Sequence, residues 1–117
     1  MPTAKGDPLQ WMARLGIGNP TIIESHISER QFQAAVVAEA KRLGWRVYHT
    51  HDSRRSEKGF PDLCLMRPPV LIFAELKTEK GIMSDEQYEW IRDICKCGTK
   101  AYLWRPGDMQ DIMEILR

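Results

Sequence analysis

The sequence has no apolar run long enough to cross a membrane. Stretches such as 70–74 are far shorter than the roughly 20 apolar residues that a bilayer requires. The first six residues are followed by charged and polar residues, which is not typical of a signal peptide. We therefore expect a cytoplasmic protein with no membrane partner.

The chain has few cysteines, and their spacing does not fit a metal site or a disulfide framework. There are three cysteines, Cys64, Cys95 and Cys97, and the last two are separated by a single residue. This spacing fits neither a zinc knuckle nor a redox pair. We expect free, mostly buried thiols in a reducing compartment. A thiol-based regulatory protein that relies on Cys95 and Cys97 remains an alternative.

The chain also lacks an excess of charge of either sign. Its formal net charge is +1, so the whole molecule has no strong electrostatic attraction to nucleic acid. Positive charge is nevertheless grouped locally, in one segment with Arg54, Arg55 and Lys58 and in another with Lys77 and Lys80. The length of 117 residues fits one domain.

We divide the chain into an arm and a domain. Residues 1–27 are weakly patterned, and a short helix around Trp11, Met12 and Leu15 is the only element expected there. This arm would pack on its own domain or form an interface with a second copy. Residues 28–117 carry clear signals and form the predicted domain.

A helix is predicted over 28–43. Ser28 and Gln31 have the spacing of a capping box, and Gly44 is a natural stop. An apolar stripe of Phe32, Val36, Ala40 and Leu43 follows the helical period, and Glu29 falls in the middle of it. A carboxylate there either enters a cleft or simply favours the helix dipole from the first turn.

Strands are predicted over 45–50, 62–66, 70–77 and 100–104, and further helices over 84–96, opened by a Ser84–Gln87 capping box, and over 108–116, capped by Asp108. The order α-β-β-β-α-β-α indicates an α/β sandwich with a mixed central sheet, because a helical crossover favours parallel pairing of the last two strands. Core positions are expected at Trp45, Trp90 and Trp104, and Met109, Ile112, Met113 and Leu116 are expected in the core or in a subunit interface.

The strand pattern brings two carboxylates together. A hairpin turn centred between Pro68 and Pro69 places Asp62 opposite Glu75, with Cβ atoms roughly 4.5–5.5 Å apart. Lys77 lies on the same face as Glu75, because side chains alternate along a strand. Opposed carboxylates are unfavourable without a cation between them, which favours a divalent metal site. Ordinary charges at strand ends, with Lys77 in a surface ion pair, are the alternative.

The same residues resemble a known family. Pro61-Asp62 followed by Glu75-Leu76-Lys77 is similar to the motif of the PD-(D/E)xK nuclease superfamily, and the surroundings resemble its VRR-NUC family. The positions that carry this resemblance lie between 28 and 117: Glu29, 32–36, Gly44-Trp45, 49–54, 59–62, 73–78, Gln87 and 104–106. The resemblance implies a restriction-endonuclease-like fold and a magnesium- or manganese-dependent DNA endonuclease.

Residue roles follow from the resemblance. Asp62 and Glu75 would be metal ligands, with the backbone carbonyl of Leu76 as a third ligand, and Glu29 would act through metal-bound water. Lys77 would orient or deprotonate the attacking water or stabilise the developing charge. Gln87 matches an auxiliary polar position of the family, although it is equally suited to cap its own helix as the partner of Ser84.

The remaining expectations concern the substrate. Arg54, Arg55, Lys58 and Lys80 are candidate DNA contacts, and such contacts fix a duplex without reading its sequence. His49 and His51 point to one face of a strand, but a zinc site needs more ligands than this segment offers. Stand-alone members of the family imply a homodimer acting on branched DNA such as four-way junctions. A non-catalytic, structure-specific DNA-binding protein is the main alternative.

Overall fold

The computed structural model describes residues 27–51 and 55–117. The arm predicted over 1–27, with its helix around Trp11, lies outside this part except for Ile27. The described elements are, in chain order, α3 (Glu29–Arg42), β1 (Arg46–His49), β2 (Leu63–Arg67), β3 (Val70–Leu76), α4 (Asp85–Lys96), β4 (Lys100–Trp104), the 3-10 helix η1 (Pro106–Asp108) and α5 (Met109–Leu116). The predicted order of helices and strands is confirmed.

The sheet is mixed, as the sequence indicated. Its strands lie in the order β1-β2-β3-β4, with antiparallel pairing from β1 to β3 and parallel pairing of β3 with β4. Leu63 pairs with Ala74 and Arg67 with Val70. This register is the one predicted from a turn between Pro68 and Pro69.

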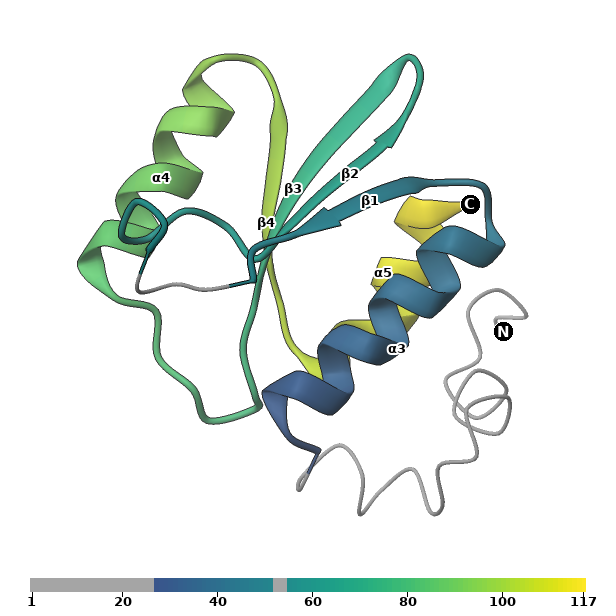
Figure 1. The fold of residues 1–117 in the computed structure, drawn as a ribbon, viewed down its shortest axis with the longest axis horizontal. Coiled ribbons are helices and arrows are strands. Elements are labelled where there is room, and N and C mark those ends of the chain that lie inside the picture. Colours follow the sequence, from purple (N-terminus) through teal and green to yellow (C-terminus); the bar gives the residue numbers. More distant parts are fainter. Residues whose placement is uncertain (1–26, 52–54) are drawn as a thin grey trace.

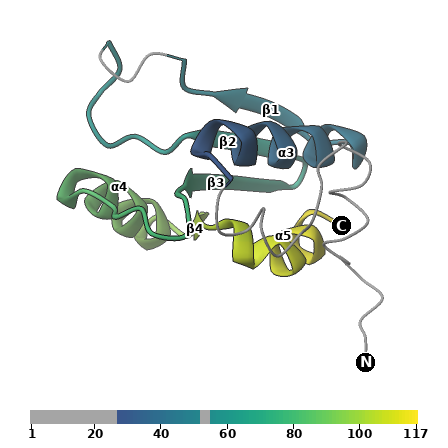
Figure 2. The ribbon, with the colours of Figure 1, turned by 90° about the horizontal axis from the view of Figure 1, so that it is seen from below.

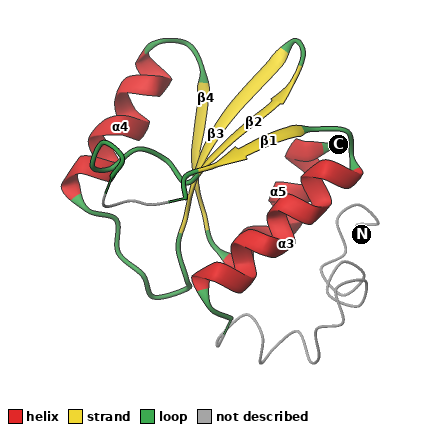
Figure 3. Cartoon of the chain, in the orientation of Figure 1, coloured by secondary structure: helices red, strands yellow, loops and turns green. Residues whose placement is uncertain are grey.

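Helices cover the sheet on both sides (Figure 1). α3 and α5 lie next to each other on one side, and α4 lies on the other. Figure 2 gives the same arrangement from below, with α4 well separated from the other two helices. The chain therefore forms three layers, and Figure 3 shows the strands enclosed between the helical layers.

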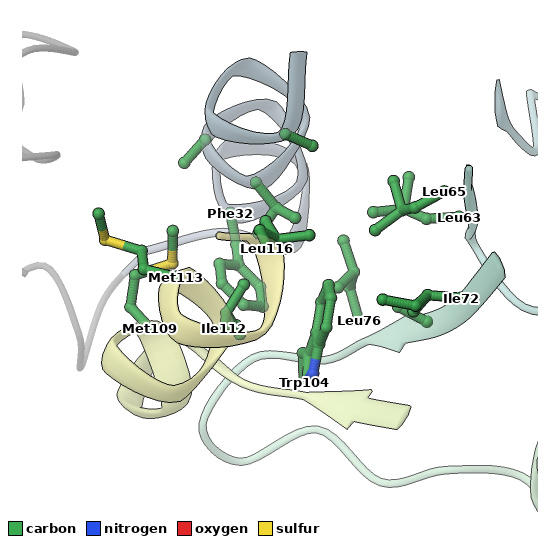
Figure 4. Close-up of a cluster of buried hydrophobic side chains, with 14 of the residues drawn as sticks. Phe32, Leu63, Leu65, Ile72, Leu76, Trp104, Met109, Ile112, Met113 and Leu116 are labelled. Carbon is green, nitrogen blue, oxygen red and sulfur yellow. The ribbon is translucent and has the colours of Figure 1, made fainter. Parts of the chain in front are cut away.

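The hydrophobic core lies between the sheet and the α3–α5 layer (Figure 4). Capping fixes the start of α3, because Ser28 Oγ accepts a hydrogen bond from the Gln31 amide and Gln31 Oε1 accepts one from the Ser28 amide, both at 3.0 Å. Phe32 on α3 is fully buried. The four apolar residues predicted on the last helix are buried as well, so they form core: Met109, Ile112, Met113 and Leu116.

Three local expectations are wrong. Asp108 precedes α5, but its carboxylate accepts a hydrogen bond from the Arg105 amide at 2.9 Å and makes no side-chain cap to α5. The intervening η1 helix redirects it. Trp90 is only half-buried, because α4 packs mainly on β4 and β3, leaves the rest of that face uncovered, and buries none of its own residues completely. The thiols are not mostly buried, since Cys64 is half-exposed and Cys95 and Cys97 are exposed.

Within residues 27–51 and 55–117, no helix is both long and apolar enough to cross a membrane.

Candidate active site

Asp62 and Glu75 lie side by side at one end of the sheet. Asp62 directly precedes β2, and Glu75 is the second-last residue of β3, so the β2–β3 register places them opposite each other. Asp62 Oδ2 accepts a hydrogen bond from the Leu76 amide at 2.8 Å. The carboxylate of Asp62 is therefore tied to the strand that carries Glu75.

The environment of Glu75 is unusual for an acid. The residue is 1% exposed, and its Oε1 has no hydrogen-bond partner among the described residues. Burial, followed by the negative charge of Asp62, raises the pKa of Glu75 to about 8, although Lys77 opposes the shift. A buried carboxylate oxygen without a donor is costly unless a cation or a proton satisfies it.

Lys77 is the cation closest to this carboxylate in the described chain. Its Nζ lies 3.6 Å from Glu75 Oε2, and its side chain is 15% exposed. The backbone amide of Lys77 donates to the Trp104 carbonyl at 3.0 Å, which extends the parallel pairing of β3 and β4. The lysine is thus anchored through its backbone, and its side chain lies mostly buried beside the carboxylate.

Gln87 satisfies both interpretations drawn from the sequence. Its Oε1 accepts from the Ser84 amide at 2.9 Å, which completes the capping box of α4. Its Nε2 donates to Glu75 Oε2 at 2.8 Å. One side-chain amide therefore starts the helix and holds the buried acid.

Glu29 faces the site from the first turn of α3. Partial burial, together with the charge of Asp62, raises the pKa of Glu29, and Lys77 lowers it. Glu29, Asp62 and Gln87 line one cleft of about 410 Å³. Glu29 is thus both a first-turn residue of α3 and a residue that lines this cleft, and its role stays a prediction.

Other residues of the cleft were not among those predicted to be catalytic, metal-binding or DNA-contacting. They are Arg30, Gln33, Thr50, His51, Ser56, Glu57 and Phe60, of which His51 had been considered only as part of a histidine pair. Gln33 could have been found, because it lies one helical turn after Glu29 on the same face. Thr50 could have been found from the antiparallel pairing of β1 and β2, and its amide donates to the Asp62 carbonyl at 2.9 Å.

The predicted DNA-contacting cations do not gather in this cleft. Arg54 lies outside the described residues. Arg55 and Lys80 are exposed, and neither lines the cleft. Lys58 lies 3.8 Å from Glu86 and lines a separate cleft whose other charged residues are acidic.

Neither a zinc site at His49 and His51 nor a thiol-based regulatory site at Cys95 and Cys97 gains support. The rings of His49 and His51 lie 4.1 Å apart. Within the described ranges, however, no group of three or more histidine, cysteine or acidic side chains is arranged to hold a metal, so a metal at the carboxylates would have at most two acidic side chains as direct ligands. Cys95 and Cys97 lie at the end of α4 opposite to Gln87, roughly 12–15 Å along the helix axis. A thiol-based site is therefore separate from the carboxylates.

Comparison with protein families agrees with this geometry. The model of the VRR-NUC domain matches residues 7–105, most of the chain. The chain belongs to the VRR-NUC family. This match makes the chain a nuclease-family domain and confirms the resemblance noted in the sequence. The match begins within the segment that precedes Ser28.

Solved structures support the same fold. A structure described as a VRR-NUC domain has a TM-score of 0.63 and 21% identity, covering 74% of this chain and 94% of that one. A VRR-NUC domain protein has a TM-score of 0.60 and 20% identity, covering 76% and 85%. Hjc of Archaeoglobus fulgidus, a Holliday junction resolvase, has a TM-score of 0.50 and 20% identity, covering 65% and 67%. A search of curated proteins gives no match.

Proposed function

We propose that this protein is a divalent-metal-dependent endonuclease that hydrolyses phosphodiester bonds of branched DNA, such as four-way junctions. One observation carries the proposal. Glu75 Oε1 is buried without a hydrogen-bond partner in the described chain, beside a second carboxylate and a lysine. A core that had only structural work to do would replace this acid with an apolar residue at little cost.

The residues present fit a hard divalent cation. Magnesium and manganese prefer oxygen ligands, and magnesium keeps several waters in its shell, so few protein ligands are needed. Asp62, Glu75 and the backbone carbonyl of Leu76 would hold the ion, and Glu29 would contact it through water. The bound ion would lower the pKa of its water and neutralise phosphate charge.

The protein side chains supply the rest of the chemistry. Lys77 is close enough to Glu75 to place a positive charge beside a phosphate, or to orient the attacking water. Gln87 donates a hydrogen bond to Glu75 Oε2, so Oε1 would be the oxygen that binds the ion. The Leu76 amide fixes Asp62 before any substrate arrives. Such preorganisation reduces the rearrangement required when charge develops.

The fold and two-fold symmetry support the proposal of a branched substrate. The fold is similar to that of Hjc, a protein described as a Holliday junction resolvase. We propose that two copies pair as a homodimer, because a two-fold dimer presents two equal sites to the equal strands of a four-way junction. Arg54, Arg55, Lys58 and Lys80 would contact phosphates outside the cleft. A monomer mass in sedimentation at micromolar concentration would contradict the dimer.

Cleavage of labelled linear, flapped and four-way-junction DNA tests the function. With magnesium or manganese we expect the junction to be cut faster than the linear duplex, and with EDTA we expect no cutting. Equal rates on all substrates would overturn the branched-DNA proposal but leave the nuclease. Metal-independent binding with no cutting would favour the non-catalytic alternative.

A further inference from the structure

Arg105 holds a turn of the backbone that follows the site lysine. It directly follows β4 and is half-buried. Its Nη1 donates to the Thr78 carbonyl at 2.6 Å and to the Gly81 carbonyl at 2.7 Å, with a longer contact of 3.2 Å to the Glu79 carbonyl. Three backbone oxygens of one short turn therefore converge on a single nitrogen.

The turn of residues 78–81 also contacts the side chain of Lys77. The Gly81 amide donates to the Thr78 carbonyl at 3.2 Å, which closes the turn. A Cβ atom at Gly81 would lie 3.4 Å from both Cβ and Cδ of Lys77. The side of Gly81 that carries no side chain therefore faces the aliphatic stem of the lysine, and a shift of the turn would change the space around that stem.

A second side-chain hydrogen bond joins the 78–81 turn to the segment that follows β4. Glu79 Oε1 accepts a hydrogen bond from the Gly107 amide at 2.6 Å, and Asp108 Oδ2 accepts one from the Arg105 amide. The Lys77 amide donates to the Trp104 carbonyl, immediately before Arg105. Lys77 and the 78–81 turn are thus hydrogen-bonded at several points to residues 104–107, at and after the end of β4.

The ammonium group itself is not firmly held. Lys77 Nζ lies 3.6 Å from Glu75 Oε2, beyond the usual length of a charge-assisted hydrogen bond. A long, flexible side chain that lacks a tight contact at its tip depends on its stem for its position. We infer that Arg105 is a positioning residue that fixes the 78–81 turn and, through it, holds Lys77 beside the carboxylates. The inference rests on the proposed nuclease function.

Arg67 provides a matched control. Its guanidinium also donates to two backbone carbonyls, those of Leu43 at 2.9 Å and Arg117 at 2.8 Å, and it lies over the ring of Trp45. Arg67 ends β2, whereas Asp62 precedes it, so the two arginines secure opposite ends of the sheet. Loss of either arginine removes a similar set of contacts, but only the contacts of Arg105 lie next to Lys77.

The first test is single-turnover cleavage of a four-way junction with magnesium, together with binding of the same DNA in calcium. Arg105→Ala should slow cleavage by about 10- to 100-fold without weakening binding, since misplacing a catalytic group by about 1 Å has effects of this size. Arg105→Lys should restore part of the rate, because an ammonium group also offers three donors. Arg67→Ala should cleave like the wild type.

A double substitution separates positioning from general damage. Adding Arg105→Ala to Lys77→Ala should cause no further loss, because a residue that acts through the lysine has nothing left to position. Full multiplication of the two losses would overturn the inference. An equal loss of rate in Arg67→Ala, or a loss confined to DNA binding, would overturn it as well.

A measurement without DNA keeps the inference separate from the proposed function. By NMR, Arg105→Ala should speed amide exchange at Gly81 and increase the mobility of the Lys77 ε-methylene, and Arg67→Ala should change neither. If the wild-type protein cuts no DNA with any divalent ion, the proposed function fails while this readout still reports on the turn. Unchanged exchange and unchanged Lys77 mobility would overturn the positioning role directly.

Discussion

At the residue scale, Gln87 combines a structural and a site contact in one amide. Its oxygen caps α4 and its nitrogen holds Glu75. Gln87→Glu keeps an acceptor for the Ser84 amide but replaces the donor with a second acid beside Glu75. We expect this variant to lose most cleavage while the helix cap survives.

Ser84→Ala is the control for that variant. It removes the hydroxyl that accepts from the Gln87 amide, so it should cost about 1 kcal/mol of stability, as cap losses do, and leave cleavage close to wild type. Thermal unfolding and junction cleavage measured on both variants test the division of roles. Equal activity of Gln87→Glu and wild type would show that the contact with Glu75 is dispensable.

Glu75 should destabilise the metal-free protein at neutral pH. The folded state keeps the proton of Glu75 up to about pH 8, whereas the unfolded chain releases it near the ordinary carboxyl pKa of 4.5. Between these values the folded state binds more protons, so stability falls as pH rises. In EDTA, Glu75→Gln should therefore raise the Tm relative to wild type, by a margin that grows from pH 5 to pH 8.

Glu114→Gln on the exposed face of α5 is the control for this effect. Its Tm difference from wild type should not change over the same pH range. A constant or shrinking difference for Glu75→Gln would mean that burial does not hold the proton on this carboxyl.

At the residue scale, sequence and structure agree where a single regular pattern, such as hairpin register or strand alternation, fixes where a side chain lies. The Pro68-Pro69 turn fixed the pairing of Asp62 with Glu75, and strand alternation added Lys77. Arg105 could not be given a role in this way, because its partners are backbone carbonyls of a turn 24–27 positions away. No side-chain pattern records such contacts.

At the element scale, the loop that carries Asp62 is packed directly on α4. Gly59 has a φ of +91°, and a Cβ there would lie 2.6 Å from the carbonyl carbon of Glu86. Phe60 stacks edge-on against Trp90 at 5.1 Å. The first turn of α4 therefore sets the path of the chain into Asp62.

Gly59→Ala should be much more damaging than Gly98→Ala. Gly98 has a similar φ of +84° but open space around it, so alanine costs only backbone strain of about 1–2 kcal/mol. At Gly59 the backbone clash adds to the same strain. We expect a clearly larger loss of unfolding free energy for Gly59→Ala in urea titrations, and similar losses for the two variants would contradict the packing.

The order of the elements was predictable, whereas their ends and their degree of burial were not. Two capping boxes set the starts of α3 and α4, and both are present as expected. The Asp108 side chain does not cap α5, because Pro106, two residues earlier, starts a 3-10 turn. The apolar residues of α4 do not reveal that this helix covers only one part of the sheet. Trp90 was therefore wrongly assigned to the core.

At the scale of the whole molecule, a bound divalent ion should stabilise the fold. A ligand that binds only the folded state adds about 2.7 kcal/mol at one hundred times its Kd. Magnesium or manganese should therefore raise the Tm of wild type, and Asp62→Asn should abolish most of this rise. Asp111→Asn, an exposed position on α5, should respond like wild type. Equal responses of all three proteins would place the ion elsewhere.

The global fold and family were accessible from the sequence because the motif residues, the helix caps and the strand order agreed with one another. The position of the phosphate-binding surface was not, since the exposed cations Arg55, Lys58 and Lys80 do not line the cleft, while Arg30 does. Charge patterning along the chain does not determine which exposed side chains meet in space.

Cleavage of a labelled four-way junction under single-turnover conditions tests the central claim most directly. The comparison is wild type, Asp62→Ala and Lys77→Ala in magnesium, with Lys41→Ala, an exposed lysine on α3, as the control. We predict metal-dependent cutting by wild type and Lys41→Ala, none by Asp62→Ala, and only a small residual rate by Lys77→Ala. Cutting that persists near the wild-type rate in Asp62→Ala and Lys77→Ala, or in EDTA, would contradict the assignment of the active site.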